Sequence, residues 1–264
     1  MEAIRVQRCD GLVTITLDRP AKKNALDSQT WAELDRVLAD VAGDPDDRAL
    51  ILTGAGGNFS AGADLSGNDS GKGLTGRWRL QPIVQEMRAV GEIIMRLHRL
   101  PKPTLAKVDG VAVGVALGLV LACDLVVASD RARFCEIFPK RGLALDGGNS
   151  WLLPRRVGLN KAKELAFFGD MVGAREAEAM GLVNKVVPVD ELAAVADEWG
   201  RRLATGPTLA LSLSKRLLDA SSSVTFEQAL EDEARCQHIT YTSQDVQEGI
   251  GAFLERREAK FRGC

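Results

Sequence analysis

The chain has 264 residues, and 45% of them are hydrophobic, so it is long enough to form one large domain with a substantial core. Its formal net charge is only −2, and acidic and basic residues are interspersed, which argues against a nucleic-acid-binding protein. The five cysteines are scattered and form no C-x-x-C motif, and the first ten residues lack the apolar core of a signal peptide. These features predict a cytoplasmic protein without a disulfide framework or a bound metal.

The N-terminal third predicts alternating strands and helices. Residues 3–8 and 12–18 alternate like the arms of a β-hairpin, and an amphipathic helix follows Asp27, which can serve as its N-cap. A short buried strand is expected at 48–54. The polar, glycine-rich segment 54–76 that follows is too long for an ordinary connection, so we expect either a disordered lid or a functional loop.

A helical pattern at 83–100 and an extended segment at 101–110 precede a stretch with glycine at every fourth position, Gly110, Gly114 and Gly118. This spacing is typical of transmembrane helix packing, but the apolar run covers only residues 111–123, and a span needs roughly 20 residues. We therefore expect a buried element in which glycine permits close approach of the backbone, and no membrane partner.

Strands and helices continue to alternate to about residue 188, and the chain is almost entirely helical from Glu191 onward. The pattern predicts an α/β fold with a helical C-terminal region. We assign residues 1–190 to the core and residues 191–264 to the helical region, although no linker or repeat marks the boundary.

Six segments resemble the crotonase family, which includes the enoyl-CoA hydratases and isomerases, in order and in spacing. The resemblance spans about residues 3–261 and is carried by ITLDRPAKKNAL, NFSAGADL, LPKPTLAKVDGVAVGVALGLVLACDLVVAS, GLALDGGNSWLLPRRVG, AREAEAMGLVNKVVP and GAFLERREAKF. It implies a crotonase-like spiral of ββα units and a C-terminal trimerisation region, giving a homotrimer or a dimer of trimers. It also implies an acyl-CoA thioester as substrate. Coenzyme A is then part of the substrate, and no separate cofactor is expected.

The resemblance also implies an oxyanion hole for the thioester carbonyl. In relatives two main-chain N–H groups form this hole. One belongs to the residue after the glycine of the AGAD-like turn, which is Ala63 here, and the other to a residue of the glycine-rich stretch, which is Val115 here. Two amides aimed at one oxygen stabilise an enolate, and the start of a helix adds to this effect. Many relatives have glycine where Val115 stands. The alternative is that the glycines serve only close packing.

The acidic residues depart from the hydratase pattern. Hydratases of the family use two glutamates, and the corresponding positions here are Gly118 and Phe138, neither of which can transfer a proton. Some isomerases of the family, including that of phenylacetate degradation, carry an aspartate at the position of Asp146. One carboxylate suffices for a 1,3-proton shift, although Asp146 can instead form an Asx-turn. Glu136 is a second catalytic candidate, or else a surface or ion-paired residue.

The resemblance implies that the CoA moiety binds near the first two of these matching segments and near the last one. The candidate cations for its phosphates are Arg19, Lys22, Lys23 and Lys260, with Phe261 as an apolar neighbour that relatives often take from an adjacent subunit. The turn that contacts pantetheine and adenine in relatives corresponds to Ser60, Ala61, Gly62, Ala63 and Asp64. The loop from Ser66 to Leu80, with Trp78, and the helix from Ile83 are expected to shape the acyl pocket.

Three functions remain open from the sequence. The favoured one is double-bond isomerisation of an enoyl-CoA through a thioester enolate, with Asp146 as the proton carrier. An atypical enoyl-CoA hydratase using Glu136 or water is the second. A non-catalytic acyl-CoA-binding subunit is the third.

Overall fold

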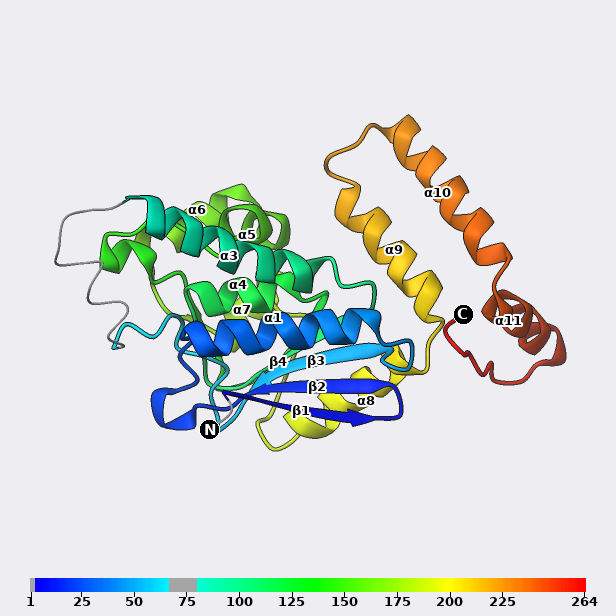
Figure 1. Ribbon diagram of the computed structural model, residues 1–264, viewed down its shortest axis with the longest axis horizontal. Coiled ribbons are helices and arrows are strands. Elements are labelled where there is room, and N and C mark those ends of the chain that lie inside the picture. Colours follow the sequence, from blue (N-terminus) through cyan, green and yellow to red (C-terminus); the bar gives the residue numbers. More distant parts are fainter. Residues whose placement is uncertain (1–2, 67–79) are drawn as a thin grey trace.

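The computed structural model describes residues 3–66 and 80–264, which form a layered α/β body with three helices extending from one side (Figure 1). The six-stranded sheet has the order β1-β2-β3-β4-β6-β9 and a three-stranded sheet has the order β5-β7-β8. The strands are β1 (Ile4–Cys9), β2 (Leu12–Leu17), β3 (Ala49–Gly54), β4 (Thr104–Val108), β5 (Val111–Val113), β6 (Leu125–Ser129), β7 (Arg133–Cys135), β8 (Val172–Gly173) and β9 (Lys185–Val187).

The predicted hairpin is present as β1 and β2, paired antiparallel with Cys9 opposite Leu12. Its two-residue loop is Asp10-Gly11, and both residues have positive φ, 49° and 78°, as the tightest hairpin loops require. The remaining neighbours in the large sheet pair parallel, from β2–β3 to β6–β9. Parallel strands need crossover connections, which the helices supply.

Helices cover both faces of the large sheet because its strands alternate between two hydrophobic clusters. Alternate residues of β3 show this: Leu50 and Leu52 belong to the cluster that includes α1 (Ser28–Gly43). Ile51 faces the opposite cluster, which includes α8 (Leu192–Ala204). The predicted N-cap of α1 is also present, since the Asp27 carboxylate accepts a hydrogen bond from the Thr30 N–H at 2.9 Å.

The other helices of the body pack around the glycine-rich stretch. They are η1 (Pro20–Lys22), α3 (Leu80–His98), α4 (Val115–Ala122), η2 (Phe138–Arg141), α5 (Asn149–Val157), α6 (Leu159–Phe168) and α7 (Ala174–Ala179). All eight residues of α4 are buried, as expected for a helix that is apolar on every side. None of the helices in the described ranges combines the length and the apolar character that crossing a bilayer requires.

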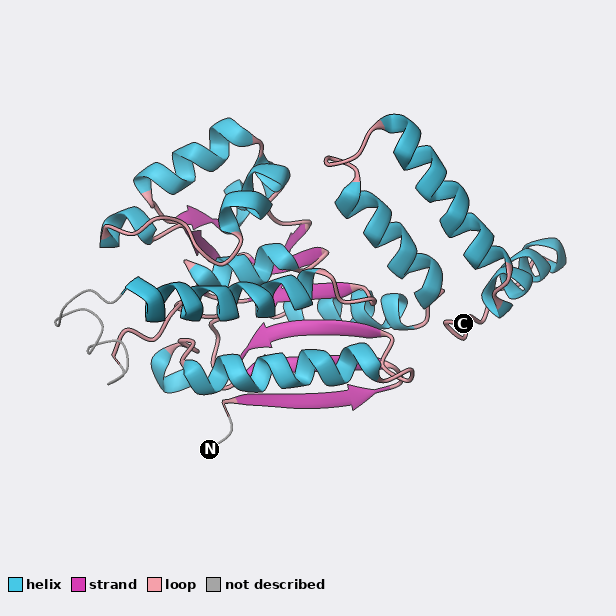
Figure 2. Cartoon of the chain, turned by 45° about the horizontal axis from the view of Figure 1, so that its top comes forward, coloured by secondary structure: helices cyan, strands magenta, loops and turns pink. Residues whose placement is uncertain are grey.

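The chain leaves the sheet after α8 and continues as α9 (Thr208–Ala220), α10 (Phe226–Tyr241) and α11 (Gln244–Glu255). These three helices extend away from the body in both views (Figures 1 and 2). The boundary predicted at residue 190 therefore falls before α8, whose apolar face packs on the sheet, and the protruding region begins with α9.

The C-terminal segment turns back toward the body and is held there by Arg48. The Arg48 guanidinium donates to the carbonyl oxygens of Gly206, at 2.5 Å, and Phe261, at 3.1 Å. This places the C-terminus near the base of α9, far from the loop that follows β3 (Figure 1).

Candidate active site

The glycine-rich stretch forms β5, a turn and α4, and its glycines lie where two backbones touch. Gly114 precedes α4 with φ of +57°, which favours glycine. A Cβ on Gly118 would lie 2.4 Å from the Gly147 carbonyl oxygen, and one on Gly110 would lie 2.3 Å from the Gly57 carbonyl oxygen. The spacing therefore reflects close approach of α4 and β5 to two other loops.

The two amides predicted to form the oxyanion hole lie on adjacent segments. Ser60 is joined to β5 by two hydrogen bonds. The Ser60 N–H donates to the Val111 carbonyl at 2.9 Å, and the Ser60 carbonyl accepts from the Val113 N–H at 3.2 Å. A Cβ on Gly62, whose φ is +92°, would lie 2.7 Å from the Val113 oxygen. Ala63 and Val115 follow these contacts directly.

Neither the Ala63 N–H nor the Val115 N–H donates a hydrogen bond to any group in the described part of the chain. Val115 is the first residue of α4, where helical N–H groups have no partner within the helix and the helix dipole favours negative charge. The two donors are thus available to an anionic oxygen.

The turn that carries Ala63 is braced by ion pairs. The Asp64 carboxylate is ion-paired with Arg19 at 2.8 Å and with Lys22 at 2.9 Å. Hydrogen bonds from Ser66, together with these two cations, hold its pKa well below the usual range. Ala61 is fixed by its N–H, which donates to the Lys23 carbonyl at 2.9 Å. Lys22 is therefore already paired.

Lys23 differs from its neighbour. Its side chain is exposed, and its ammonium group makes no ion pair within residues 3–66 and 80–264. Of the cations predicted near this turn, Lys23 has the charge that is most available for a phosphate.

Asp146 lies in the turn before α5, next to the start of α4. A Cβ on Gly147, the next residue, would lie 2.8 Å from Val115 Cγ2, which shows how closely this turn approaches Val115. Asp146 Oδ1 is buried and has no hydrogen-bond partner in the described part of the chain. Burial raises the pKa of this carboxyl to about 6. The side chain caps no helix, but the Asp146 carbonyl accepts the Asn149 N–H at 3.1 Å.

Glu136 is buried, with only 1% of its surface exposed, so the expectation of a surface or ion-paired residue is wrong. Among residues 3–66 and 80–264, neither carboxyl oxygen of Glu136 has a hydrogen-bond partner. Burial, and to a smaller extent the negative charge of Asp146, raises the pKa of Glu136 to about 8. A neutral Glu136 therefore stands close to an ionised Asp146 at neutral pH.

Of the two positions where hydratases carry glutamate, Gly118 has no room for a side chain, and position 138 holds a buried phenylalanine that cannot transfer a proton. Gly118 touches the Gly147 carbonyl, as described above, and Phe138 is 4% exposed, with its ring against the Gly114 turn. Asn149, which the sequence analysis did not single out, is fully buried and donates from Nδ2 to the Gly114 carbonyl at 3.2 Å. It ties the two loops together, and its only sequence signal is a polar residue directly after Gly147-Gly148.

Lys260 and Phe261 do not approach this site within one chain. The Lys260 N–H donates to Glu248 of α11 at 2.7 Å, and the Phe261 ring lies against Gly249 of the same helix. They belong to the C-terminal segment, at the opposite side of the molecule from the loop after β3 (Figure 1).

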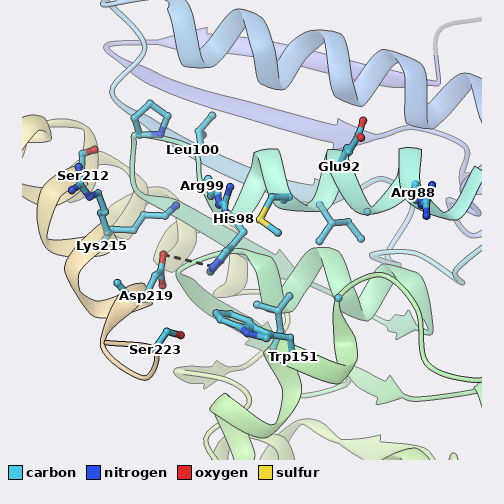
Figure 3. Close-up of a pocket in the computed structure, with 18 residues that line it drawn as sticks. Arg88, Glu92, His98, Arg99, Leu100, Trp151, Ser212, Lys215, Asp219 and Ser223 are labelled. Atoms are coloured by element: carbon cyan, nitrogen blue, oxygen red, sulfur yellow. Dashed lines mark ion pairs between the residues drawn. The ribbon is translucent and has the colours of Figure 1, made fainter. Parts of the chain in front are cut away.

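A cavity of about 1020 Å³ lies between α3, α5 and α9 (Figure 3). It begins at Gly148, two residues after Asp146, and Ile94, Trp151 and Leu152 form an apolar part of its wall. The helix expected to shape the acyl pocket, α3, thus lines a cavity that reaches the Asp146 turn. Most of the loop that was expected to contribute, including Trp78, lies outside the described residues.

In the part of the chain that the structure describes, no group of three or more His, Cys, Asp or Glu side chains is arranged to hold a metal ion.

Comparisons with known proteins identify the family and agree with the overall fold. A profile described as enoyl-CoA hydratase/isomerase matches residues 7–264. The 1,2-epoxyphenylacetyl-CoA isomerase of Escherichia coli (strain K12) is 38% identical, over 96% of this chain and 95% of its own. Crotonyl-CoA hydratase of Syntrophomonas wolfei is 32% identical over 98% of both chains. The crystal structure of an enoyl-CoA hydratase from Bacillus anthracis superimposes with a TM-score of 0.92 at 29% identity, covering 99% of this chain and 100% of that one.

Proposed function

We propose that this chain, which belongs to the enoyl-CoA hydratase/isomerase family and has its fold, moves a carbon–carbon double bond within an enoyl-CoA. One observation carries the proposal. The carboxyl of Asp146 has an unpartnered buried oxygen beside Val115, whereas the two hydratase positions hold Gly118 and Phe138. The relative named as a 1,2-epoxyphenylacetyl-CoA isomerase supports this choice, and the crotonyl-CoA hydratase shows that both chemistries occur among relatives.

Asp146 begins the reaction as a carboxylate. With a pKa raised to about 6 it is ionised at neutral pH and is a stronger base than an exposed aspartate. It takes a proton from C2 of a 3-enoyl thioester, and the C–H electron pair moves toward the carbonyl to give a dienolate. The same carboxyl then returns the proton to C4, which leaves the double bond between C2 and C3. Protons and electrons balance without water.

The dienolate places negative charge on the thioester oxygen. We assign its stabilisation to the free N–H groups of Ala63 and Val115, which need no rearrangement because the backbone holds them in place. In enzymes generally, loss of one such donor costs about 3 kcal/mol of transition-state stabilisation.

Glu136 keeps the site at a single negative charge. Its pKa of about 8 leaves it protonated at neutral pH, while Asp146 is ionised. Above this range a second buried charge would oppose both the Asp146 carboxylate and the dienolate, so turnover should fall. The two values belong to the pair, because the carboxyls interact.

Hydration is the second candidate, and the buried pair is the observation that favours it. Adding water to a double bond needs one group to activate water and another to protonate carbon, and Glu136 and Asp146 are two carboxyls in different protonation states. An acyl-CoA binder without catalysis is the remaining candidate.

Purified protein offered a 3-enoyl-CoA and, separately, a 2-enoyl-CoA distinguishes these functions. Isomerisation of the first substrate creates the absorbance of a conjugated thioester, and hydration of the second removes it. Asp146→Asn should abolish isomerisation, whereas the control Asp190→Asn, at an exposed position outside the site, should not. Hydration of the 2-enoyl-CoA by the wild-type protein, lost in Asp146→Asn, favours the hydratase that uses both carboxyls; hydration that survives Asp146→Asn favours one that uses Glu136 or water alone. CoA binding without any turnover favours the binder.

The CoA moiety itself is proposed to lie along the turn of Ser60, Ala61, Gly62 and Asp64, with Lys23 facing its phosphates. Lys22 contributes mainly by holding Asp64. Because Lys260 and Phe261 lie far from this turn in their own chain, we assign them to the site of a neighbouring copy in a homotrimer or a dimer of trimers.

Self-association is supported by the apolar side chains that α10 and α11 expose. Phe226 is 75% exposed, Phe253 is 81% exposed and Leu254 is 74% exposed. Large apolar residues gathered on protruding helices are typical of protein–protein contacts.

A further inference from the structure

The far end of the cavity, opposite Gly148, is polar. There α9 presents Lys215 and Asp219, and α3 presents His98 (Figure 3). Trp151 lies between this polar end and the apolar side chains of Ile94 and Leu152. The centroids of the Trp151 and His98 rings are 5.5 Å apart in an edge-on arrangement. A ligand that extends from the Asp146 turn toward α9 passes Ile94, Leu152 and Trp151 before it meets these three side chains, whereas Arg88 and Glu92 of α3 line the cavity farther from α9 (Figure 3).

His98 and Asp219 face each other at ion-pair distance (Figure 3). The 3.8 Å between His98 Nε2 and Asp219 Oδ2 is too long for a hydrogen bond, and neither side chain makes a hydrogen bond to the described residues. Burial lowers the pKa of His98 and raises that of Asp219. One donor and one acceptor thus remain available at the same place.

The charges nearby largely cancel. Lys215 is paired with Asp124 at 3.0 Å, and its side chain is only 10% exposed. An anionic group at this end would meet the carboxylates of Asp124 and Asp219, and a cationic group would meet Lys215. Arg88, Glu92, Arg99 and Arg216 also border the cavity, but all four are exposed, so water screens them.

A saturated hydrocarbon end fits poorly here. It would remove water from Asp219, His98 and Lys215 and offer no hydrogen bond in exchange, which is costly for polar groups. The volume of about 1020 Å³ is also at the upper end of ordinary ligand pockets, more than a short acyl chain occupies.

We propose that this cavity binds the acyl group and that His98, Asp219 and Lys215 form a distal subsite for an uncharged hydroxyl at its end. The inference rests on the proposed function, since it takes the thioester to lie at Ala63 and Val115. The substrate class is then an enoyl-CoA whose acyl group carries a terminal hydroxyl. The hydroxyl donates to Asp219 and accepts from Lys215 or His98.

Binding of non-reactive thioesters tests the subsite separately from catalysis. Saturated acyl-CoAs that share one chain length and end in methyl, hydroxyl or carboxylate are titrated calorimetrically into the full-length protein, over a series of lengths. At the length that reaches α9, the hydroxyl compound should bind about fivefold to tenfold more tightly than the methyl compound, as one net hydrogen bond allows. The carboxylate compound should bind no more tightly than the methyl compound.

Variants connect the preference to the residues. Asp219→Ala should reduce the ratio of hydroxyl to methyl affinity to about one, Asp219→Asn should retain part of it, and Asp190→Ala, at an exposed position, should leave it unchanged. Unaltered binding of the methyl compound by Asp219→Ala shows that this variant is folded.

The outcomes separate the two proposals. Equal affinities at every length, or tighter binding of the carboxylate, overturn the subsite, even if the protein isomerises enoyl-CoAs. A hydroxyl preference that Asp219→Ala does not reduce overturns the role of Asp219. A hydroxyl preference without turnover supports the subsite and counts against isomerisation.

Discussion

Replacing Glu136 with Gln should change how the stability of the protein depends on pH. Glu136 is buried without a partner, and its pKa is about 8 in the fold against an ordinary value of 4.5. Since the folded value is the higher one, this group favours folding most below pH 4.5, and the protein loses stability as pH rises toward about 8.

The size of the effect follows from these two values. One unit of difference between the folded and unfolded pKa corresponds to about 1.4 kcal/mol, so the full rise from 4.5 to about 8 corresponds to about 5 kcal/mol. Roughly 3 kcal/mol of this falls between about pH 5 and about pH 8. The Gln amide does not titrate. It has two N–H donors where the protonated acid has one O–H, and the additional unpaired donor costs about 1–2 kcal/mol of stability at every pH.

The assay is urea unfolding of the wild-type protein and of Glu136→Gln across this pH range. The free energy of unfolding of the variant should fall by about 3 kcal/mol less than that of the wild type. Glu198→Gln, at an exposed position on α8, serves as the matched control and should follow the wild-type curve. Parallel curves for Glu136→Gln and the wild type would refute a buried, unpaired Glu136.

Three further predictions concern the contacts around the site and the surface of the C-terminal helices. Gly118→Ala would place a Cβ 2.4 Å from the Gly147 carbonyl, so it should lower the free energy of unfolding by about 1–3 kcal/mol and reduce turnover; wild-type values for both would contradict the close approach. Asn149→Ala removes the hydrogen bond to the Gly114 carbonyl and should lower the free energy of unfolding by about 1–3 kcal/mol. In steady-state kinetics kcat should decrease by a larger factor than KM changes, and a change in KM alone would argue against a positioning role. Phe253→Asp should shift the sedimentation of the protein toward the monomer, and an unchanged sedimentation coefficient would remove α11 from the interface.

Much of the fold was predictable from the sequence because the signals are local. The Asp10-Gly11 loop fixes the hairpin, and Asp27 marks the start of α1. The glycine spacing predicted close approach of backbones, which the contacts of Gly110 and Gly118 confirm. The resemblance to the family supplied the arrangement of the whole, which the comparisons support.

The environment of the site was not predictable in the same way. Whether Glu136 faces water or the core depends on how the segment from β7 to η2 packs against the Gly114 turn and α6, which alternation along a three-residue strand cannot show. Likewise, His98 and Asp219 are more than a hundred residues apart in sequence, and they meet only because α9 returns past α3. Sequence patterns along one element carry no information on such contacts.

The rate of double-bond migration in Asp146→Asn and Glu136→Gln, measured side by side at neutral pH on one 3-enoyl-CoA, tests the central claim most directly. Removing the group that transfers the proton should reduce kcat in Asp146→Asn by about 10²–10⁴-fold. Glu136→Gln replaces a neutral acid by a neutral amide and should keep kcat within about tenfold of the wild type. The reverse ranking, with Glu136→Gln inactive and Asp146→Asn active, would show that the proton is carried by the other carboxyl.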